Sequence, residues 1–347
     1  MNMKKLNVAL AILVTAVMAG NAQTSVNSEA VGYVTTTISA GPGGGVAKAT
    51  PISPVLLELT SSTGLKNGII SGVTPSSITV ASAGWTANAL SSNQGYVMIT
   101  GGSQSGLIIR IISNTTDTVT LDSFGLDIAT AGVAVGDPFK IIVGETLLSM
   151  FGNPSNGVVG GTSAQFSART IDTVVARDAN GSMRTYYFDT GSNTWRRSGS
   201  SSDQGGTPIA PNAGVLYYRV GTTDLAFVQT GTVPSSQTKY IIPAGGSVFL
   251  GRFFPADGTI ANYNLNNLSG WSNTSQGGVT TASVDKLVTI DSSSAVRSYF
   301  YTGTRWQRSG SSSGQDSIAV PAGGAVYTVR NGTGSASILT VPAPYTL

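Results

Sequence analysis

Two residue types that carry much of protein chemistry are missing, because none of the 347 residues is cysteine or histidine. Disulfides, thiolate catalysis, His-ligated metals and Ser-His-Asp hydrolysis are therefore excluded within this chain. The glycine-rich run from Gly41 to Gly45 lacks the Lys-Ser/Thr pair and the strand-to-helix setting of a phosphate-binding loop. We therefore predict no catalytic residue, no cofactor and no metal, and a protein that is not an enzyme.

The acidic residues leave two site classes to consider, paired carboxylates as in glycosidases and oxygen ligands for calcium. Asp178, Asp189 and Asp257 stand at expected turn positions, where side-chain-to-backbone hydrogen bonds account for them. Asp178-Ala-Asn180-Gly181 resembles the start of a calcium loop, but no later acidic ligand follows it. An Asn-Gly hairpin turn is the better interpretation of that segment.

Charged residues are also scarce, at 10% of the chain, against about 25% in an ordinary soluble domain. The 19 basic and 16 acidic side chains nearly balance. After the N-terminal Lys4-Lys5 pair, no basic run is longer than Arg196-Arg197, so we expect no nucleic-acid partner. Uncharged Ser, Thr, Asn and Gly supply the polar surface instead, a composition found in extracellular β proteins.

The first 22 residues have the three parts of a secretory signal peptide. Lys4 and Lys5 form the basic region, Val8 to Met18 the apolar region, and Gly20-Asn-Ala22 a small-x-small cleavage site. We therefore expect export, with a mature chain from Gln23 that resides in the periplasm, at the cell surface or outside the cell. No later segment reaches 18 consecutive apolar residues, so no transmembrane segment is expected in the mature chain.

The most informative feature is a stretch that occurs twice, at residues 184–202 and 297–313. Each copy has an aromatic strand, a tight turn, a strand with one tryptophan and a Ser-Gly-Ser-Ser-Ser loop. The similarity extends upstream, where Asp172 aligns with Asp285, and downstream, where Tyr217 aligns with Tyr327. Two copies of one β unit are therefore predicted.

Short β-branched and aromatic runs alternate with Gly, Asn and Ser breaks along the mature chain. The only helix expected there is one turn at residues 146–151. We predict an all-β fold of tandem small β-sandwich or β-barrel modules. The predicted parts are a signal peptide (1–22), an N-terminal β domain (23–151), a linker (152–168), β unit copy 1 (169–255), a linker or insertion (256–280) and β unit copy 2 (281–347).

The repeated hairpins allow two interpretations. Their tryptophans could fill small cores, since aromatic side chains dominate packing. Alternatively, each tryptophan could lie exposed beside an arginine and stack on a sugar ring or an anionic polymer. The candidate binding face would then comprise Tyr186, Trp195, Arg197, Tyr299, Trp306 and Arg308. Burial of both tryptophans would remove the basis for this second interpretation.

Several segments together resemble an uncharacterised family of exported, β-rich bacterial proteins that occurs in many paralogous copies per genome. The resemblance rests on Glu29-Ala-Val-Gly-Tyr-Val34, Ile111 to Leu121, Gly136-Asp-Pro-Phe139, Thr146 to Phe151 and the two Tyr/Trp hairpins. It covers most of the mature chain and its motifs are structural. The resemblance implies export and a β-rich fold, and it implies no activity.

The leading hypothesis is an exported, non-enzymatic structural or cell-surface protein. Residues 25–38 are extended and could pair with a neighbour's sheet edge to give self-association, or more simply pair within their own domain. The alternative is a carbohydrate-binding or adhesion module that uses the two hairpins on an extracellular polysaccharide.

Overall fold

The computed structural model describes residues 30–57, 67–178, 181–273, 284–332 and 335–346. The predicted signal peptide and Asn180 lie outside these residues. Strands account for 43% of the structure and helices for 8%, which confirms the prediction of an all-β fold. Residues 31–347 form one compact unit. Within the described ranges, no helix has the length and apolar character needed to cross a membrane.

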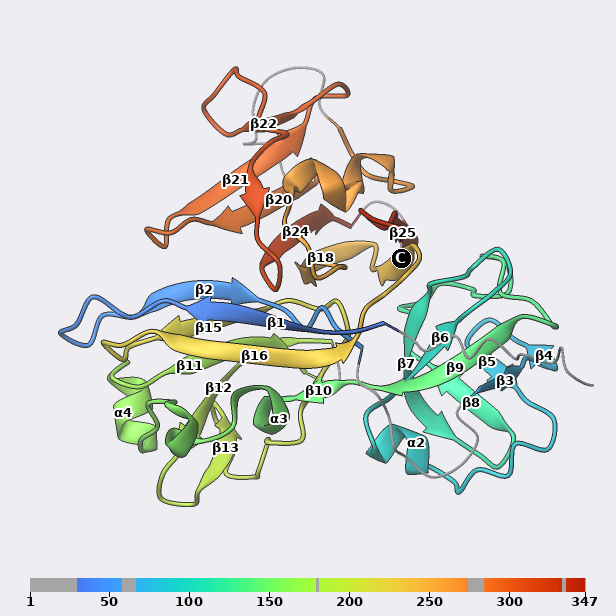
Figure 1. Cartoon of the computed structure of the whole chain (residues 1–347), viewed down its shortest axis with the longest axis horizontal. Helices are drawn as coiled ribbons and strands as arrows, with labels where there is room; N and C mark the ends of the chain where they lie inside the picture. Colours follow the sequence, from blue (N-terminus) through green and yellow to red (C-terminus); the bar gives the residue numbers. More distant parts are fainter. Residues whose placement is uncertain (1–29, 58–66, 179–180, 274–283, 333–334, 347) are drawn as a thin grey trace, which may run out of the picture. The chain divides into compact units, whose positions relative to one another are not determined.

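Residues 67–143 form a seven-stranded half-barrel (Figure 1). Its strand order is β3 (Asn67–Ile69), β9 (Pro138–Val143), β6 (Gly95–Ile99), β7 (Ile108–Asn114), β8 (Thr118–Leu121), β5 (Ser77–Thr79) and β4 (Gly72–Val73). The short helix α2 (Ala89–Ser92) precedes β6. Aliphatic side chains such as Val97, Ile109 and Ile141 fill the core. Every pairing in this sheet is antiparallel, as expected for strands joined by short turns.

Two further sheets share one five-strand order. The first is β13 (Thr194–Arg197), β12 (Met183–Asp189), β11 (Thr173–Arg177), β15 (Val215–Arg219) and β2 (Lys48–Ile52). The second is β22 (Trp306–Arg308), β21 (Val296–Tyr301), β20 (Lys286–Ile290), β24 (Ala325–Asn331) and β18 (Gly245–Gly251). The order within each sheet is therefore the same although the strands come from different parts of the chain.

Four two-stranded sheets complete the correspondence. β1 (Val31–Ile38) pairs with β16 (Leu225–Thr232), as β17 (Thr238–Ile242) pairs with β25 (Ser337–Val341). β10 (Glu145–Thr146) pairs with β14 (Pro208–Ile209), as β19 (Gly258–Thr259) pairs with β23 (Ala319–Val320). We call residues 31–57 with 144–232 repeat 1, and residues 238–346 repeat 2. Each strand pairing of repeat 1 has a counterpart in repeat 2.

These pairings divide the chain differently from the predicted boundaries. β1 and β2, placed by sequence in the domain 23–151, belong to repeat 1, and β17 and β18, placed in copy 1, belong to repeat 2. The half-barrel interrupts repeat 1 between β2 and β10. Strands pair here across long sequence separations, so contiguous boundaries do not describe them.

The two stretches predicted as linkers carry ordered helical turns. Residues 152–168 contain η1 (Pro154–Asn156) and α4 (Ser163–Ser167), and residues 256–280 contain η2 (Ile260–Tyr263) and η3 (Leu265–Asn267). Ile260, Tyr263 and Trp271 are buried in the core of repeat 2. The predicted helical turn at 146–151 is confirmed as α3 (Leu147–Phe151), whose N-terminus is capped by Thr146.

The strand register corrects one sequence alignment between the copies. Val174 pairs with Tyr217 in repeat 1, and its counterpart Leu287 pairs with Thr328 in repeat 2. Thr328, not Tyr327, therefore occupies the place of Tyr217. The same shift of one residue brings Arg219 into correspondence with Arg330, and both arginines are buried.

The two repeats contact each other through the same surface. An isolated β-bridge joins Ile52 to Gly324, and a second joins Leu250 to Ala213, which are the counterparts of these residues. The amide of Ser53 donates to the Gly323 carbonyl at 2.8 Å, and the equivalent bond, from Gly251 to Asn212, is also 2.8 Å. Reciprocal contacts of this kind define a self-complementary, two-fold interface, here built within one chain.

Candidate functional site

The structure buries the tryptophans of the predicted binding face. Trp195 and Trp306 are each 1% exposed. The indole N–H of Trp195 donates to the Gly152 carbonyl at 2.8 Å, and its ring meets Phe188 edge-on. Trp306 packs against Trp271 and Tyr301. The interpretation of these hairpins as exposed stacking platforms is therefore wrong, because the rings fill the two repeat cores instead.

The other four predicted residues divide between core and surface. Tyr186 and Tyr299 are buried, and burial raises the pKa of the Tyr186 phenol. Arg197 lies 3.7 Å from Asp178 in a partly exposed ion pair. Arg308, its counterpart, is exposed and lines a cleft together with Tyr299. Of the six predicted residues, only these last two come together at a cavity large enough for a ligand.

The Ser-Gly-Ser-Ser-Ser loops have a structural role in both repeats. Gln204 follows the first loop and its amide donates to the Trp195 carbonyl at 2.7 Å. Gln315 makes the same bond to Trp306 at 2.8 Å. The loops thus return the chain to the tryptophan strand in the same way in both repeats.

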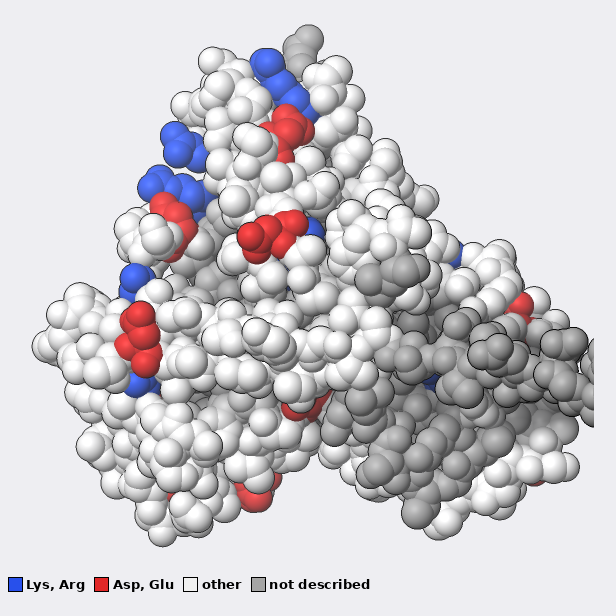
Figure 2. Space-filling view, in the orientation of Figure 1, with Lys and Arg blue, Asp and Glu red and all other residues white. Residues whose placement is uncertain are grey.

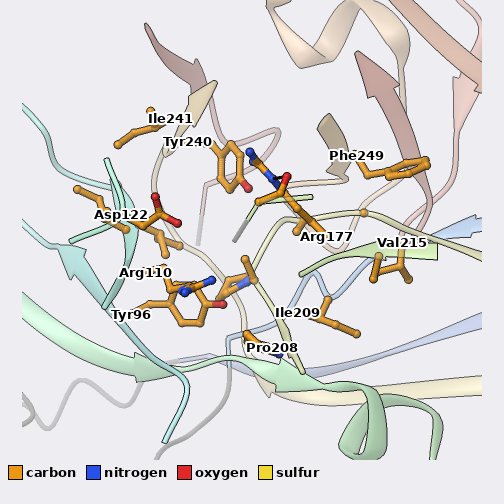
Figure 3. Close-up of a pocket in the computed structure, with 18 of the residues that line it drawn as sticks. Tyr96, Arg110, Asp122, Arg177, Pro208, Ile209, Val215, Tyr240, Ile241 and Phe249 are labelled. Carbon is orange, nitrogen blue, oxygen red and sulfur yellow. Dashed lines mark hydrogen bonds between the residues drawn. The ribbon is translucent and has the colours of Figure 1, made fainter. Parts of the chain in front are cut away.

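A small cavity of about 70 Å³ lies where the half-barrel meets both repeats. Figure 3 shows Tyr96, Arg110 and Asp122 reaching it from the half-barrel, with Arg177 and Tyr240 from the repeats. Burial raises the pKa of Tyr96 and of Tyr240. Ligand sites usually enclose roughly 300–1,000 Å³, so this cavity suits a few water molecules rather than a ligand.

A second cavity is an open cleft of about 700 Å³, within the usual range of ligand sites. Its walls are β1 and β2 of repeat 1 and β20, β21 and the segment around β23 of repeat 2. Lys48, Arg297 and Arg308 line it together with one acidic residue, Asp291. The charged residues that line the cleft therefore carry a net positive charge. The view in Figure 2 shows a surface that is mostly uncharged.

The small cavity and the open cleft are counterparts. The corresponding residue pairs, taken from the strand registers, are Ala176 with Thr289, Asp178 with Asp291, Ile209 with Val320, Tyr240 with Thr36 and Phe249 with Pro51. The half-barrel fills the first member of this pair of sites, where Lys239 of β17 forms a parallel bridge with Leu107. The second member stays open.

Asp291 neutralises one of the three cations of the cleft. It accepts hydrogen bonds from Ser293 Oγ at 2.6 Å, from the Ala295 amide at 2.9 Å and from Arg297 Nε at 2.9 Å. These bonds, that of Ser293 foremost, hold the pKa of the Asp291 carboxyl well below its usual range. The carboxylate of Asp178, the first residue of the segment that resembles a calcium loop, likewise accepts a hydrogen bond from the Ser182 amide at 2.9 Å.

We expect Ser293→Ala to raise the pKa of Asp291 toward the ordinary value of about 3.9, because the variant removes the largest stabilising contact of the carboxylate. NMR titration of the Asp291 carboxyl carbon measures this shift. A carboxyl whose pKa is lower in the folded than in the unfolded state stabilises the fold at pH values above its unfolded-state pKa. This stabilisation is lost as the pH falls through the folded-state pKa. An unchanged titration curve in Ser293→Ala would contradict the assignment of the cause.

The β1–β16 pair exposes an uncharged face that we call the ribbon face. β1 pairs along 8 residues with β16 of the same chain, which lies in the predicted β unit copy 1 and not in the predicted domain 23–151, while residues 25–29 lie outside the described part. Val31, Tyr33 and Val228 are 61%, 76% and 58% exposed. The ribbon face consists of Val31, Tyr33, Thr35, Thr37, Ala226, Val228 and Thr230.

The counterpart of the ribbon face in repeat 2 is covered. Lys239 and Ile241 correspond to Thr35 and Thr37, and both are buried. The amide of Lys239 donates to the Gly106 carbonyl at 2.9 Å, and Ile241 joins the half-barrel core. The same surface of the repeat is thus an interface in repeat 2 and free among the described residues in repeat 1.

Comparison with known proteins gives no relative, since no family model, no curated protein and no solved structure matches the chain. The resemblance to a multi-copy exported family therefore stays a prediction. Sequence reasoning missed the cleft residues Thr36 and Lys48, for which no local motif exists. It also missed the buried pairing of Asp172 with Arg219, although the alignment of Asp172 with Asp285 was a signal for it.

Proposed function

We propose that this chain is an exported, non-enzymatic structural or cell-surface protein that associates through its ribbon face. The observation that supports this most is the exposed ribbon face of repeat 1, whose counterpart in repeat 2 is covered by the half-barrel. Three exposed apolar side chains on a charge-free strand pair are unusual on a surface that must stay monomeric. A β surface of a neighbouring copy is the occupant that the covered counterpart suggests.

The proposed role also agrees with the composition. In proteins that stay monomeric, exposed edge strands such as those of a two-stranded sheet are usually protected by charged residues, above all lysine. The position equivalent to buried Lys239 is Thr35, and no member of the ribbon face carries charge. The chain also lacks histidine and cysteine, and no group of three His, Cys, Asp or Glu suited to a metal occurs in the described ranges.

We expect Tyr33→Lys with Val228→Lys to convert assemblies of residues 23–347 into monomers, because lysine on both strands opposes close packing of the face. Size-exclusion chromatography with light scattering and negative-stain microscopy measure this change. Val135→Lys is the matched control, since Val135 is 63% exposed and belongs to the half-barrel, not to the ribbon face. A wild-type monomer at every concentration tested, or assemblies that the double variant leaves intact, would contradict the proposal.

The carbohydrate-binding alternative loses its original basis with the burial of Trp195 and Trp306. The avidity expected from two equivalent hairpin sites also loses its basis, because the two counterpart sites, the small cavity and the open cleft, differ from each other. A role in binding must therefore be argued from other residues.

A further inference from the structure

The counterpart relation between the small cavity and the open cleft shows what each is suited to hold. Large side chains of repeat 2 line the filled site: Ile241 packs in the half-barrel core, Tyr240 lies beside Tyr96 and Asp122 of the half-barrel, and Phe249 lines the cavity as well. The open cleft has Thr36, Thr37 and Pro51 at the same positions. Apolar anchors that hold a protein module are thus replaced by hydroxyl groups and a small ring. The cleft is therefore poorly suited to a second protein module and well suited to a hydrated, hydroxyl-rich ligand.

Two cations of the cleft have no partner among the described residues. Arg297 is paired with Asp291 at 2.9 Å, whereas Lys48 and Arg308 make no hydrogen bond or ion pair there. Lys48 stands where repeat 2 has Gly246, so this charge is particular to the open cleft. Unpaired cations beside a cavity favour anionic ligand groups, above all carboxylates, which arginine can bind with two parallel hydrogen bonds.

A buried hydroxyl points to the same ligand. Thr36 is 8% exposed, lines the cleft and has an Oγ1 atom without a hydrogen-bond partner in the described part of the chain. A buried polar atom without a hydrogen-bond partner costs free energy. A ligand atom that forms a hydrogen bond with Thr36 Oγ1 would remove this cost, which favours binding. Thr50, Thr289 and Gln315 add groups that can both donate and accept, as sugar hydroxyls require.

We propose that the cleft between the repeats binds an acidic oligosaccharide, with Lys48 and Arg308 at its carboxylates and Thr36 at a sugar hydroxyl. The site differs from the predicted tryptophan face and contains only Tyr299 and Arg308 of it. It shares Thr35 and Thr37 with the ribbon face, but Tyr33 and Val228 do not line it. Saccharide binding and self-association can therefore be abolished separately.

The test uses a galacturonic acid tetramer as the acidic probe and cellotetraose as the neutral one, with the chain from residue 23 and isothermal titration calorimetry at low ionic strength. We expect the acidic tetramer to bind and its affinity to fall as salt is added, because the cations are at the surface. Arg308→Ala and Lys48→Ala should each raise Kd about tenfold, the effect of losing one charge-assisted hydrogen bond.

Two further variants separate binding from folding. Arg197→Ala is the matched control, since Arg197 is the counterpart of Arg308 in repeat 1 and does not line the cleft. It should leave Kd unchanged. Thr36→Val keeps the side-chain shape and removes the unpaired hydroxyl, so the unfolding midpoint should hold or rise while Kd increases severalfold.

Three results would overturn the proposal. The first is no binding of the acidic tetramer, and the second is equal binding of the neutral one. The third is an affinity that Lys48→Ala and Arg308→Ala leave unchanged. A polyglutamate peptide that binds as tightly as the tetramer would replace the saccharide with an acidic polypeptide and so overturn it as well. Loss of assembly in Tyr33→Lys with Val228→Lys bears only on the ribbon face.

Discussion

Replacing Asp172 with alanine is expected to lower the free energy of unfolding by about 3–5 kcal/mol, the usual cost of breaking a buried ion pair. Asp172 is buried and contacts Arg219 Nη1, and it accepts the Tyr217 hydroxyl at 2.8 Å and the Val220 amide at 2.8 Å. Removing the carboxylate leaves the guanidinium of Arg219 buried without its counter-charge. Urea denaturation followed by tryptophan fluorescence measures the change.

The control is an exposed ion pair of the same repeat. Arg184 Nε lies 3.0 Å from Asp178 with about half of the arginine side chain in solvent. Arg184→Ala should therefore change stability by only about 0–1 kcal/mol. Asp285→Ala tests repeat 2, where Asp285 accepts the Asn331 amide at 2.8 Å and contacts Arg330. Equal losses of unfolding free energy in Asp172→Ala and Arg184→Ala would contradict the conclusion that the buried ion pair contributes more to stability than the exposed one.

The buried pairs explain part of what could be predicted from sequence. Asp172 and Asp285 align because they keep the same place in both repeats, and the hairpins align because their strands are neighbours in the chain. Local pairing leaves a contiguous signal, so two β units could be predicted. Partners far apart leave none, because a strand's period of two shows which side chains share a face and not which strand lies beside it.

One remote signal could have extended the repeat. Ile38-Ser-Ala-Gly41 begins at the last residue of β1 and Ile242-Pro-Ala-Gly245 at the last residue of β17, which are corresponding places of the two repeats. The half-barrel stands between β2 and the rest of repeat 1, and so hides this correspondence from a comparison of contiguous segments. The identical segments Pro243-Ala-Gly-Gly246 and Pro321-Ala-Gly-Gly324 occupy positions that do not correspond in the two repeats.

The cleft could not be predicted, for a geometric reason. Thr36, Lys48, Arg297 and Arg308 come from four strands, and the two repeats bring them together through their reciprocal contact. Each residue alone resembles an ordinary surface or strand position. The site is recognised only when counterpart residues are compared, Thr36 with Tyr240 and Pro51 with Phe249. This comparison requires the strand registers of both repeats.

The left-handed turn at this contact is shared by both repeats and explains one glycine. Gly323 has φ of +71° and its counterpart Asn212 has φ of +64°, a region that glycine and asparagine adopt most readily. A Cβ at Gly323 would also clash with Thr36 Oγ1. Glycine at this position therefore leaves room for the hydroxyl that we place in the saccharide site.

Trp195→Ala is expected to destabilise the protein by about 3–5 kcal/mol, as is usual for a buried large aromatic residue. The indole packs against Phe151 and Phe188, and its loss also leaves the Gly152 carbonyl without its donor. Trp195→Phe should lower the free energy of unfolding by less, because it keeps an aromatic ring in the core although it also loses the indole N–H. Urea denaturation of both variants measures the difference.

The same variants decide between the two interpretations of the hairpins. A tryptophan that fills the core must lower stability when removed, and Trp195→Ala should leave the Kd of the galacturonic acid tetramer unchanged in protein that is still folded, because Trp195 does not line the cleft. Trp306→Ala should act in the same way through the core of repeat 2. Unchanged stability together with lost saccharide binding would restore the tryptophans as a binding face.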